Sequence, residues 1–334
     1  MAADRGHHER RFRAMGSDVH LIVVGGHEAL IDRAERRIHD LEQRWSRFLG
    51  TSEISRINAA SGQWVTVSAD TVLLIERAIE AWRVTGGGFD PTVLEAVVAA
   101  GYDRSFDELA ADRPATASPP VWHVGLVGPT DIDLDGLAVR LPAGCGFDPG
   151  GIGKGLCADL VVTELLGGGA AGACVNMGGD VRVAGIAPGG STWTIAIEHP
   201  HSPEPIAMVG LAAGAVATST TLRRTWSVGG QRRHHLIDPS TGQPSDSDLD
   251  LATVVAGEAW TAEVLAKALV LRGSQRAFDV VDPAVAAGLT VDGGGTVRTT
   301  PGFSAYAGGI EVCGMMALDS GVDPLGPDLA DIDD

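Results

Sequence analysis

The sequence predicts an α+β fold in which antiparallel or mixed sheets are flanked by helices. Strand signals joined by short glycine turns recur along the chain, and long amphipathic helical segments interrupt them at irregular intervals. A regular doubly wound sheet would instead place a helix after every strand. The chain has 334 residues, 44% of them hydrophobic, which is enough to bury a large core.

The first third of the chain predicts one strand followed by helices. Residues 18–26 are rich in β-branched side chains and stop at glycine, as a strand does. Residues 28–48 predict a helix, since apolar side chains recur at helical spacing: Leu30, Ile31, Ala34, Ile38, Leu41 and Trp45. Thr51 or Ser52 is expected to cap a short helical turn, with Glu53 in its first turn.

Two further helices are expected before residue 103. Residues 69–85 form an amphipathic pattern that three glycines terminate, and the Asp90-Pro91 pair begins another short helix. Residues 103–120 are polar and rich in alanine and proline, so we expect a surface excursion. Short strands are predicted near residues 122–126 and 137–141.

The second half mixes hairpins with two helices. The stretch "FDPGGIGKGLCAD" (residues 147–159) leads a glycine loop into a helix that three glycines end. Residues 171–177 and 181–186 form a predicted hairpin around a Gly-Gly-Asp turn. Further strands are expected over residues 193–200, 206–219 and 251–257, a loop over residues 234–245, and a helix over residues 258–273.

The charge distribution argues against two classes of partner. A formal net charge of −18 lacks the basic face that a nucleic-acid-binding protein needs. No stretch approaches the roughly 18 apolar residues of a membrane span, so we expect no membrane insertion. Residues 317–334 hold six aspartates and no basic residue, which predicts a solvated, disordered tail.

Cysteine usage and the amino terminus favour a cytoplasmic location. The four cysteines, Cys145, Cys157, Cys174 and Cys313, form no CxxC pair, so buried free thiols are expected. The first residues lack the apolar segment of a signal peptide.

The glycine loop of residues 147–159 fits neither common phosphate motif. A P-loop would need glycine at Asp148 and Ser or Thr at Gly155, and a dinucleotide fingerprint would need glycine at Leu156. Glycine amides, a helix amino terminus and Lys154 could nevertheless hold an anion. The alternative is an ordinary tight turn with a surface lysine, and the loop alone gives the two interpretations about even weight.

Several segments together resemble the ApbE family of flavin transferases. In chain order they are "MGSDVHLIV", "WSRFLGTSEISRIN", "TGGGFDPTVLEAV", "FDPGGIGKGLCAD", "CVNMGGDVRVAG", "VATSTTLRR", "HHLIDPSTGQP" and "WTAEVLAKALVLRG". The resemblance implies an ApbE-like, T-fold-like domain over residues 15–303, with a flexible segment before it (residues 1–14) and the acidic tail after it (residues 304–334).

The resemblance also implies an activity. Members of this family use FAD to attach FMN through a phosphoester bond to a Thr or Ser of a target flavoprotein, and release AMP. FAD and a target flavoprotein are therefore the expected partners. The rivals are an FAD pyrophosphatase, in which water replaces the acceptor hydroxyl, and a non-catalytic FAD-binding protein.

Residues that match the family motifs are assigned roles by this resemblance. The catalytic candidates are His235, Asp238 and Lys154. The expected FAD-binding residues are Ser52, Glu53, Phe89, Asp90, Asp148, Gly150, Gly151, Lys154, Asn176, Gly178, Gly179, Asp180, Thr218, Ser219, Arg223 and Lys267. The bland alternatives are that Asp90 and Asp238 start turns and that His235 is structural.

The sequence departs from the family at the expected magnesium site. The family pattern D-A-L-A-T uses its Asp and Thr, with a backbone carbonyl of the glycine loop, to bind Mg²⁺. Glu263 and Lys267 stand at those positions, and the loop carbonyl would be that of Gly151. A carboxylate suits Mg²⁺, whereas an ammonium has no lone pair to donate.

Three interpretations of this departure compete. Glu263, the loop carbonyl and the FAD phosphates bind Mg²⁺ without residue 267, or Lys267 replaces part of the metal charge at the pyrophosphate. The third is an i,i+4 Glu–Lys pair that only stabilises the helix.

Overall fold

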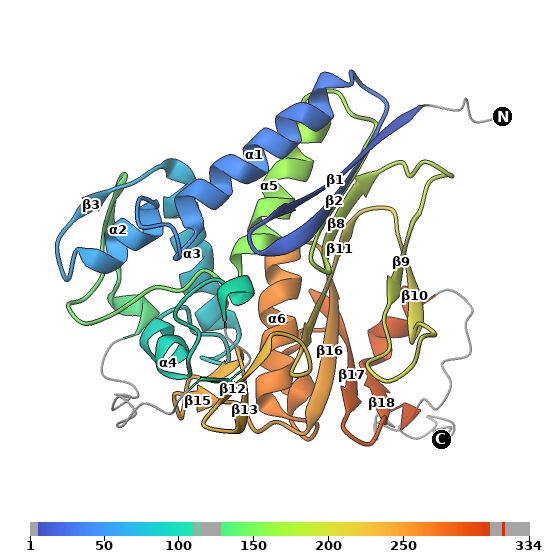
Figure 1. Cartoon of the computed structure of the whole chain (residues 1–334). Helices are drawn as coiled ribbons and strands as arrows, with labels where there is room; N and C mark the ends of the chain where they lie inside the picture. Colours follow the sequence, from blue (N-terminus) through green and yellow to red (C-terminus); the bar gives the residue numbers. More distant parts are fainter. Residues whose placement is uncertain (1–5, 110–111, 114–127, 308–315, 318–334) are drawn as a thin grey trace, which may run out of the picture.

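A nine-stranded sheet forms the centre of the molecule (Figure 1), as seen in a computed structural model that describes residues 6–109, 112–113, 128–307 and 316–317. The strand order is β1-β2-β7-β8-β11-β16-β17-β18-β19, and neighbours are antiparallel except β18 and β19. The strands are β1 (His7–Ala14), β2 (Ser17–Val24), β7 (Gly172–Met177), β8 (Asp180–Gly185), β11 (Gly214–Thr220), β16 (Leu249–Ala256), β17 (Ala286–Asp292), β18 (Val297–Thr299) and β19 (Met316–Ala317).

Helices and small sheets surround the large sheet. The α-helices are α1 (Ala29–Trp45), α2 (Glu53–Ala59), α3 (Ala69–Val84), α4 (Leu94–Ala99), α5 (Gly153–Gly167) and α6 (Ala259–Arg272). The 3₁₀ turns are η1 (Phe106–Glu108), η2 (Pro129–Asp131), η3 (Ala277–Val280) and η4 (Pro301–Ala305). The small sheets combine β3 (Val65–Thr66), β6 (Ala138–Arg140) and β5 (Asp133–Asp135); β9 (Trp193–Ile197) and β10 (Ala207–Leu211); β4 (Asp112–Arg113), β12 (Thr225–Val228) and β13 (Gln231–His234); and β14 (Ile237–Asp238) and β15 (Gln243–Pro244).

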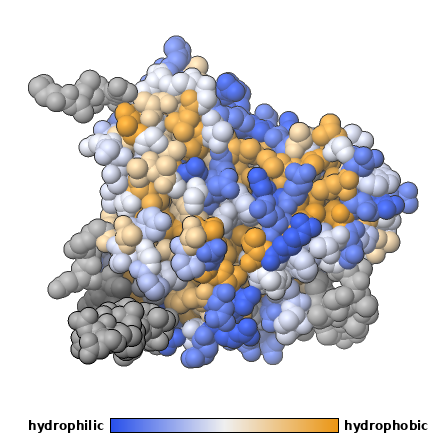
Figure 2. All heavy atoms as spheres, turned by 180° about the vertical axis from the view of Figure 1, so that it is seen from behind, coloured by the Kyte–Doolittle hydropathy of each residue, from blue (hydrophilic) through white to orange (hydrophobic). Residues whose placement is uncertain are grey.

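The large sheet is buried on both faces. Alternate residues of a strand point to opposite faces, and those of β2 divide accordingly: Leu21 and Val23 join the core under the helices, whereas Val24 joins the second core. That second core lies beneath the β9–β10 ribbon and includes Trp193. Seen from behind, the surface of the molecule mixes apolar and hydrophilic areas (Figure 2).

Helices α5 and α6 cap each other at their amino termini. The Asp159 carboxylate of α5 accepts hydrogen bonds of 2.9 Å from the Ala259 and Trp260 amides of α6. In return, Glu263 Oε2 of α6 accepts a 2.8 Å bond from the Gly155 amide of α5. A Cβ on Gly155 would lie 2.5 Å from the Ala259 carbonyl oxygen, so only glycine allows this approach. The reciprocal caps fix the two helices at one end of the sheet.

Most predicted elements are confirmed. The six apolar residues predicted to face the core from the helix over residues 28–48 are the buried residues of α1. Ser52 caps α2 by accepting a bond from the Ser55 amide. The predicted Gly-Gly-Asp hairpin joins β7 and β8. The predicted strand at residues 122–126 lies outside the described residues.

Other predictions are wrong. Residues 7–14 form β1, so that part of the expected flexible amino terminus is an edge strand paired along its length with β2. The predicted loop over residues 234–245 contains the β14–β15 ribbon. Strand β17 was not predicted, although it is a buried central strand. Most of the predicted acidic tail lies outside the described residues, but η4 extends to Ala305 and Met316–Ala317 form β19 of the large sheet, so these parts of the tail are not disordered.

Two further expectations from the sequence concern membrane insertion and the state of the cysteines. Across the described part, the structure contains no helix whose length and apolar character would let it cross a bilayer. Cys145, Cys157 and Cys174 are free thiols, and burial raises the pKa of Cys145 and of Cys174 to about 12. Cys313 lies outside the described residues.

Candidate active site

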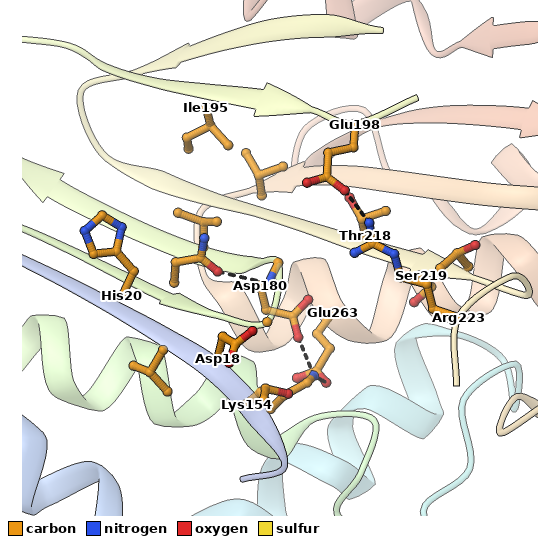
Figure 3. A pocket seen from close by; sticks show the side chains of 18 of the residues that line it. Asp18, His20, Lys154, Asp180, Ile195, Glu198, Thr218, Ser219, Arg223 and Glu263 are labelled. Carbon is orange, nitrogen blue, oxygen red and sulfur yellow. Dashed lines mark hydrogen bonds and ion pairs between the residues drawn. The ribbon is translucent and has the colours of Figure 1, made fainter. Parts of the chain in front are cut away.

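A cavity of about 1180 Å³ opens on the β9–β10 side of the large sheet and extends to the α5 and α6 amino termini. Strand residues such as Asn176, Thr218 and Trp193 form one part of its wall. Lys154, Glu263 and Lys267 enter from the helices. The cavity therefore joins a partly apolar strand surface to a charged end (Figure 3).

Lys154 lies between two buried carboxylates at that charged end (Figure 3). Its ammonium forms ion pairs with Asp180 and Glu263, whose side chains are 6% and 5% exposed. The two-residue turn at Gly178 and Gly179 places Asp180, because both glycines have positive φ, 66° and 103°. Asn176 Oδ1 accepts a 2.9 Å bond from the Gly179 amide and fixes this turn.

Burial is the largest influence on the pKa values of Asp180 and Lys154. It raises the pKa of Asp180 to about 6, although the Lys154 charge opposes the shift. Burial alone would lower the pKa of Lys154, but Asp180 and Glu263 together raise it above the ordinary value. Lys154 is therefore a fixed ammonium whose charge the two carboxylates offset.

Four amides of the glycine loop donate to oxygen atoms of the protein itself. The Gly150 amide donates to Asp148 Oδ1 at 2.8 Å, and the Ile152 and Gly153 amides donate to the Pro149 carbonyl at 3.1 and 2.8 Å. The Gly155 amide at the start of α5 donates a hydrogen bond to Glu263 Oε2. The anion at the Gly155 amide is thus an internal carboxylate.

Lys267 lies behind the same loop. Its ammonium is 5.7 Å from the centre of the Phe89 ring and beside Gly151, where an added Cβ would collide with Nζ. Burial lowers the pKa of Lys267, and Glu263 and Asp148 partly oppose that shift. Within the described residues, Lys267 forms no ion pair. The i,i+4 pair with Glu263 that the sequence allowed is therefore wrong.

These residues do not fit a magnesium ion held by Glu263 and the Gly151 carbonyl. Glu263 Oε1 contacts Lys154 and Oε2 accepts from the Gly155 amide. The Lys267 ammonium beside Gly151 would repel a divalent cation. Nowhere in the described ranges do three or more His, Cys, Asp or Glu side chains gather in a group able to hold a metal.

His235 contributes a different kind of group to the cavity. Its Nδ1 is buried and has no hydrogen-bond partner within the described residues. Burial, assisted by the positive charges of Lys267 and Arg224, lowers the pKa of His235 well below 6.5. The imidazole is therefore neutral at neutral pH and can accept a proton.

The structure does not bring Asp238 to the cavity. This residue lies in β14, and its Oδ1 accepts bonds from the Ser240 amide and hydroxyl at 2.8 and 2.7 Å. The carboxylate thus stabilises a turn, which is the alternative role that the sequence indicated for Asp238.

Other predicted site residues divide into two groups. Gly150, Asn176, Gly178, Gly179, Thr218, Ser219 and Arg223 line the cavity together with Lys154, Asp180, His235, Glu263 and Lys267. Ser52, Glu53 and Asp90 instead stabilise local structure. Glu53 accepts from the Ser68 amide and hydroxyl at 3.0 and 2.7 Å, and Asp90 accepts from the Thr92 amide at 2.7 Å.

Arg47 supports the glycine loop, and no role for it was predicted. Its guanidinium is 3.6 Å from Asp148 Oδ2, donates to the Tyr102 carbonyl at 2.9 Å, and lies 4.2 and 4.7 Å from the centres of the Phe48 and Tyr102 rings. An arginine directly before an aromatic residue in "WSRFLG" was the available signal, but the loop that it reaches is about a hundred residues away.

Known proteins match the chain over most of its length. The ApbE family model matches residues 15–289. An FAD:protein FMN transferase of Vibrio cholerae is 28% identical over 296 residues, covering 85% of this chain and 84% of the relative. One from Klebsiella pneumoniae is 30% identical over 261 residues, covering 74% and 78%.

Solved structures agree with this match. The crystal structure of an ApbE protein from Thermotoga maritima aligns with a TM-score of 0.78 at 27% identity, covering 90% of this chain and 99% of that one. The fold, the order of the motifs and the family match agree, and we conclude that this chain belongs to the ApbE family.

Proposed function

We propose that this protein is an FAD:protein FMN transferase whose flavin transferase domain, expected from the sequence over residues 15–303, also includes the sheet strands β1 and β19. The observation that carries the proposal is the unpartnered Nδ1 of His235 at a cavity that also holds Lys154, Asp180, Glu263 and Lys267. Relatives that match most of the chain bear the name FAD:protein FMN transferase. FAD is then the substrate that enters the cavity.

The reaction transfers the FMN-phosphoryl group from FAD to a protein hydroxyl. The oxygen of a Thr or Ser attacks the FMN-side phosphorus, and a new O–P bond forms. The bond between that phosphorus and the bridging oxygen breaks, and AMP leaves with the bridging oxygen. The proton of the attacking hydroxyl passes to His235, whose lowered pKa leaves the ring neutral and able to accept it.

The remaining residues position the reactants. Asp180 and Glu263 hold Lys154, while Asn176 and the glycine turn hold Asp180 at the cavity wall. Thr218 lines the strand side of the cavity and shares a 2.8 Å hydrogen bond with Thr253. A rigid set of polar groups lowers the barrier because it needs no reorganisation during the reaction.

Incubation with FAD and a flavoprotein domain from the same genome tests the proposal. Transfer predicts that AMP is released in equal amount to FMN that becomes covalently attached to the acceptor. Free FMN together with an unmodified acceptor would indicate a pyrophosphatase, and bound FAD without any AMP would indicate a binding protein. Either result would contradict transferase activity.

The expected partner follows from this function, whereas the location rests on the cysteines. We propose a target flavoprotein with an acceptor Thr or Ser, no nucleic-acid partner, and a cytoplasmic location. The free, buried thiols of Cys157 and Cys174 support a reducing compartment. Fractionation of cells that produce the untagged chain checks the location.

A further inference from the structure

The chain contains two lysines, Lys154 and Lys267, among 25 Lys and Arg residues, and both line the same cavity. All the other residues in this group of 25 are arginines. Lysine differs from arginine in carrying a compact, point-like charge in place of a planar fork. The cavity therefore contains both of the compact ammonium groups that lysine supplies to this chain.

The two lysines differ in their partners. Lys154 pairs with Asp180 and Glu263, so two negative charges already offset its charge. Lys267 reaches the cavity beside Gly151 and makes no ion pair with any described carboxylate. Of the two ammonium groups, Lys267 is therefore the one that a negatively charged ligand can pair with.

The loop leaves room for this ammonium, and four of its amides are already paired. A Cβ on Gly151 would collide with Lys267 Nζ and lie 2.8 Å from the Phe89 ring, so the glycine creates the space that Nζ fills. The amides of Gly150, Ile152, Gly153 and Gly155 already donate to protein oxygens. A diphosphate at this loop would consequently find its positive partner in a side chain.

We propose that the Lys267 ammonium, in place of a divalent metal ion, is the cation that contacts the FAD diphosphate. The inference rests on the proposed function only for the choice of FAD as ligand. Lys267 holds the diphosphate against the glycine loop, while Phe89 and Gly151 fix the ammonium. Glu263 stands at the family's metal-ligand position, but here it pairs with Lys154 and accepts a hydrogen bond from the Gly155 amide at the start of α5.

FAD binding in EDTA tests this directly. The wild type should bind FAD without metal, and added Mg²⁺ should leave the affinity nearly unchanged. Lys267→Met should weaken FAD binding in EDTA by about 10- to 100-fold, the usual loss for a charge-assisted contact. Riboflavin, which has no phosphate, should bind the variant and the wild type equally. The matched control, Arg36→Met on the exposed face of α1, removes one charge far from the loop and should change neither affinity.

A spectroscopic readout is independent of affinity. With [ε-¹³C]lysine incorporated, the chain gives signals from two lysine side chains, which Lys267→Met assigns. In EDTA, FAD should shift the Lys267 signal more than the Lys154 signal. Gly151→Ala, which displaces the ammonium, should reduce that shift, whereas Gly153→Ala should not, since its Cβ would meet nothing closer than 3.7 Å.

The outcomes separate this inference from the proposed function. Metal-dependent FAD binding that Lys267→Met leaves intact would overturn the inference even if FMN is transferred. An equal loss of riboflavin binding would also overturn it, because the effect would not concern phosphate. Metal-free FAD binding that depends on Lys267 would support the inference even if no AMP is ever released.

Discussion

His235 is the residue whose chemistry the structure specifies most closely. The charges that act on its ring, chiefly those of Lys267 and Arg224, are positive, and its Nδ1 has no partner within the described residues. A lowered pKa means that the ring loses its proton at lower pH than an ordinary histidine. The base form therefore predominates at pH 6.5 and above.

This sign gives a testable pH dependence. Single-turnover AMP release should be independent of His235 ionisation between pH 6.5 and 8, with any acid limb below pH 6.5. His235→Asn should slow release by roughly 10²–10⁴-fold while FAD still binds. An acid limb at or above pH 6.5 that His235→Asn abolishes would contradict a neutral His235, and so would an undiminished rate in the variant.

At the residue scale, sequence could identify cavity residues but not their partners. Lys154, Asp180 and Glu263 were all expected at the site from motif resemblance. Their mutual ion pairs were not, because they join residues 26 and 109 positions apart. Asp238 was misjudged for the opposite reason: its local turn with Ser240 uses the carboxylate that the motif suggested for catalysis.

At the scale of elements, the close approach of α5 and α6 restricts which residue can stand at position 155. Gly155→Ala should lower the free energy of unfolding by about 1–3 kcal/mol, since the new methyl group overlaps backbone that cannot rotate away. Gly153→Ala, two residues earlier, should be neutral or stabilising by up to about 1 kcal/mol. Urea unfolding of both variants checks this, and equal stability of the two would contradict the proposed close approach.

Three helices meet at Arg37 of α1. Its guanidinium donates to Asp70 of α3 at 2.7 and 2.8 Å and to Glu164 of α5 at 2.8 Å. The Arg37 hydrogen bond lowers the pKa of Asp70 below its ordinary value. The stabilisation is therefore complete above the unfolded-state pKa of about 4 and is lost as pH falls through the lower folded-state pKa.

A substitution isolates this contribution. Asp70→Asn should lower the free energy of unfolding by about 1–3 kcal/mol at pH 7. The difference from the wild type should shrink at pH 3 and below, because the unfolded-state carboxylate takes up a proton below its pKa of about 4. Denaturant titrations at both pH values measure it, and a difference independent of pH would show that the charge of Asp70 contributes nothing.

Element prediction succeeded where local signals were complete. The buried face of α1 follows from helical spacing, and the β7–β8 turn follows from two glycines. Strand β1 could not be foreseen, since its sequence "HHERRFRA" is mostly polar and becomes a strand by pairing with β2 along an edge. Strand β17 is apolar, but glycine and alanine carry little strand propensity.

At the scale of the whole molecule, the charged residues carried by α5 and α6 lie at one end of the large sheet. The face of that sheet on the β9–β10 side forms a wall of the cavity. The α+β class was predictable because hairpins and helices alternate irregularly. The cavity was not, since it depends on how β9–β10 covers the sheet and on how α5 and α6 cap each other. The assembled site nevertheless draws together residues from most of the motifs that indicated the family.

Intact-mass spectrometry of the acceptor tests the central claim most directly. After incubation with this chain and FAD, the acceptor flavoprotein domain should gain one FMN in phosphoester linkage, with one AMP released for each adduct. An acceptor whose target Thr or Ser is replaced by alanine should gain none. An unmodified acceptor, alongside FAD that is either intact or hydrolysed to free FMN, would contradict the account.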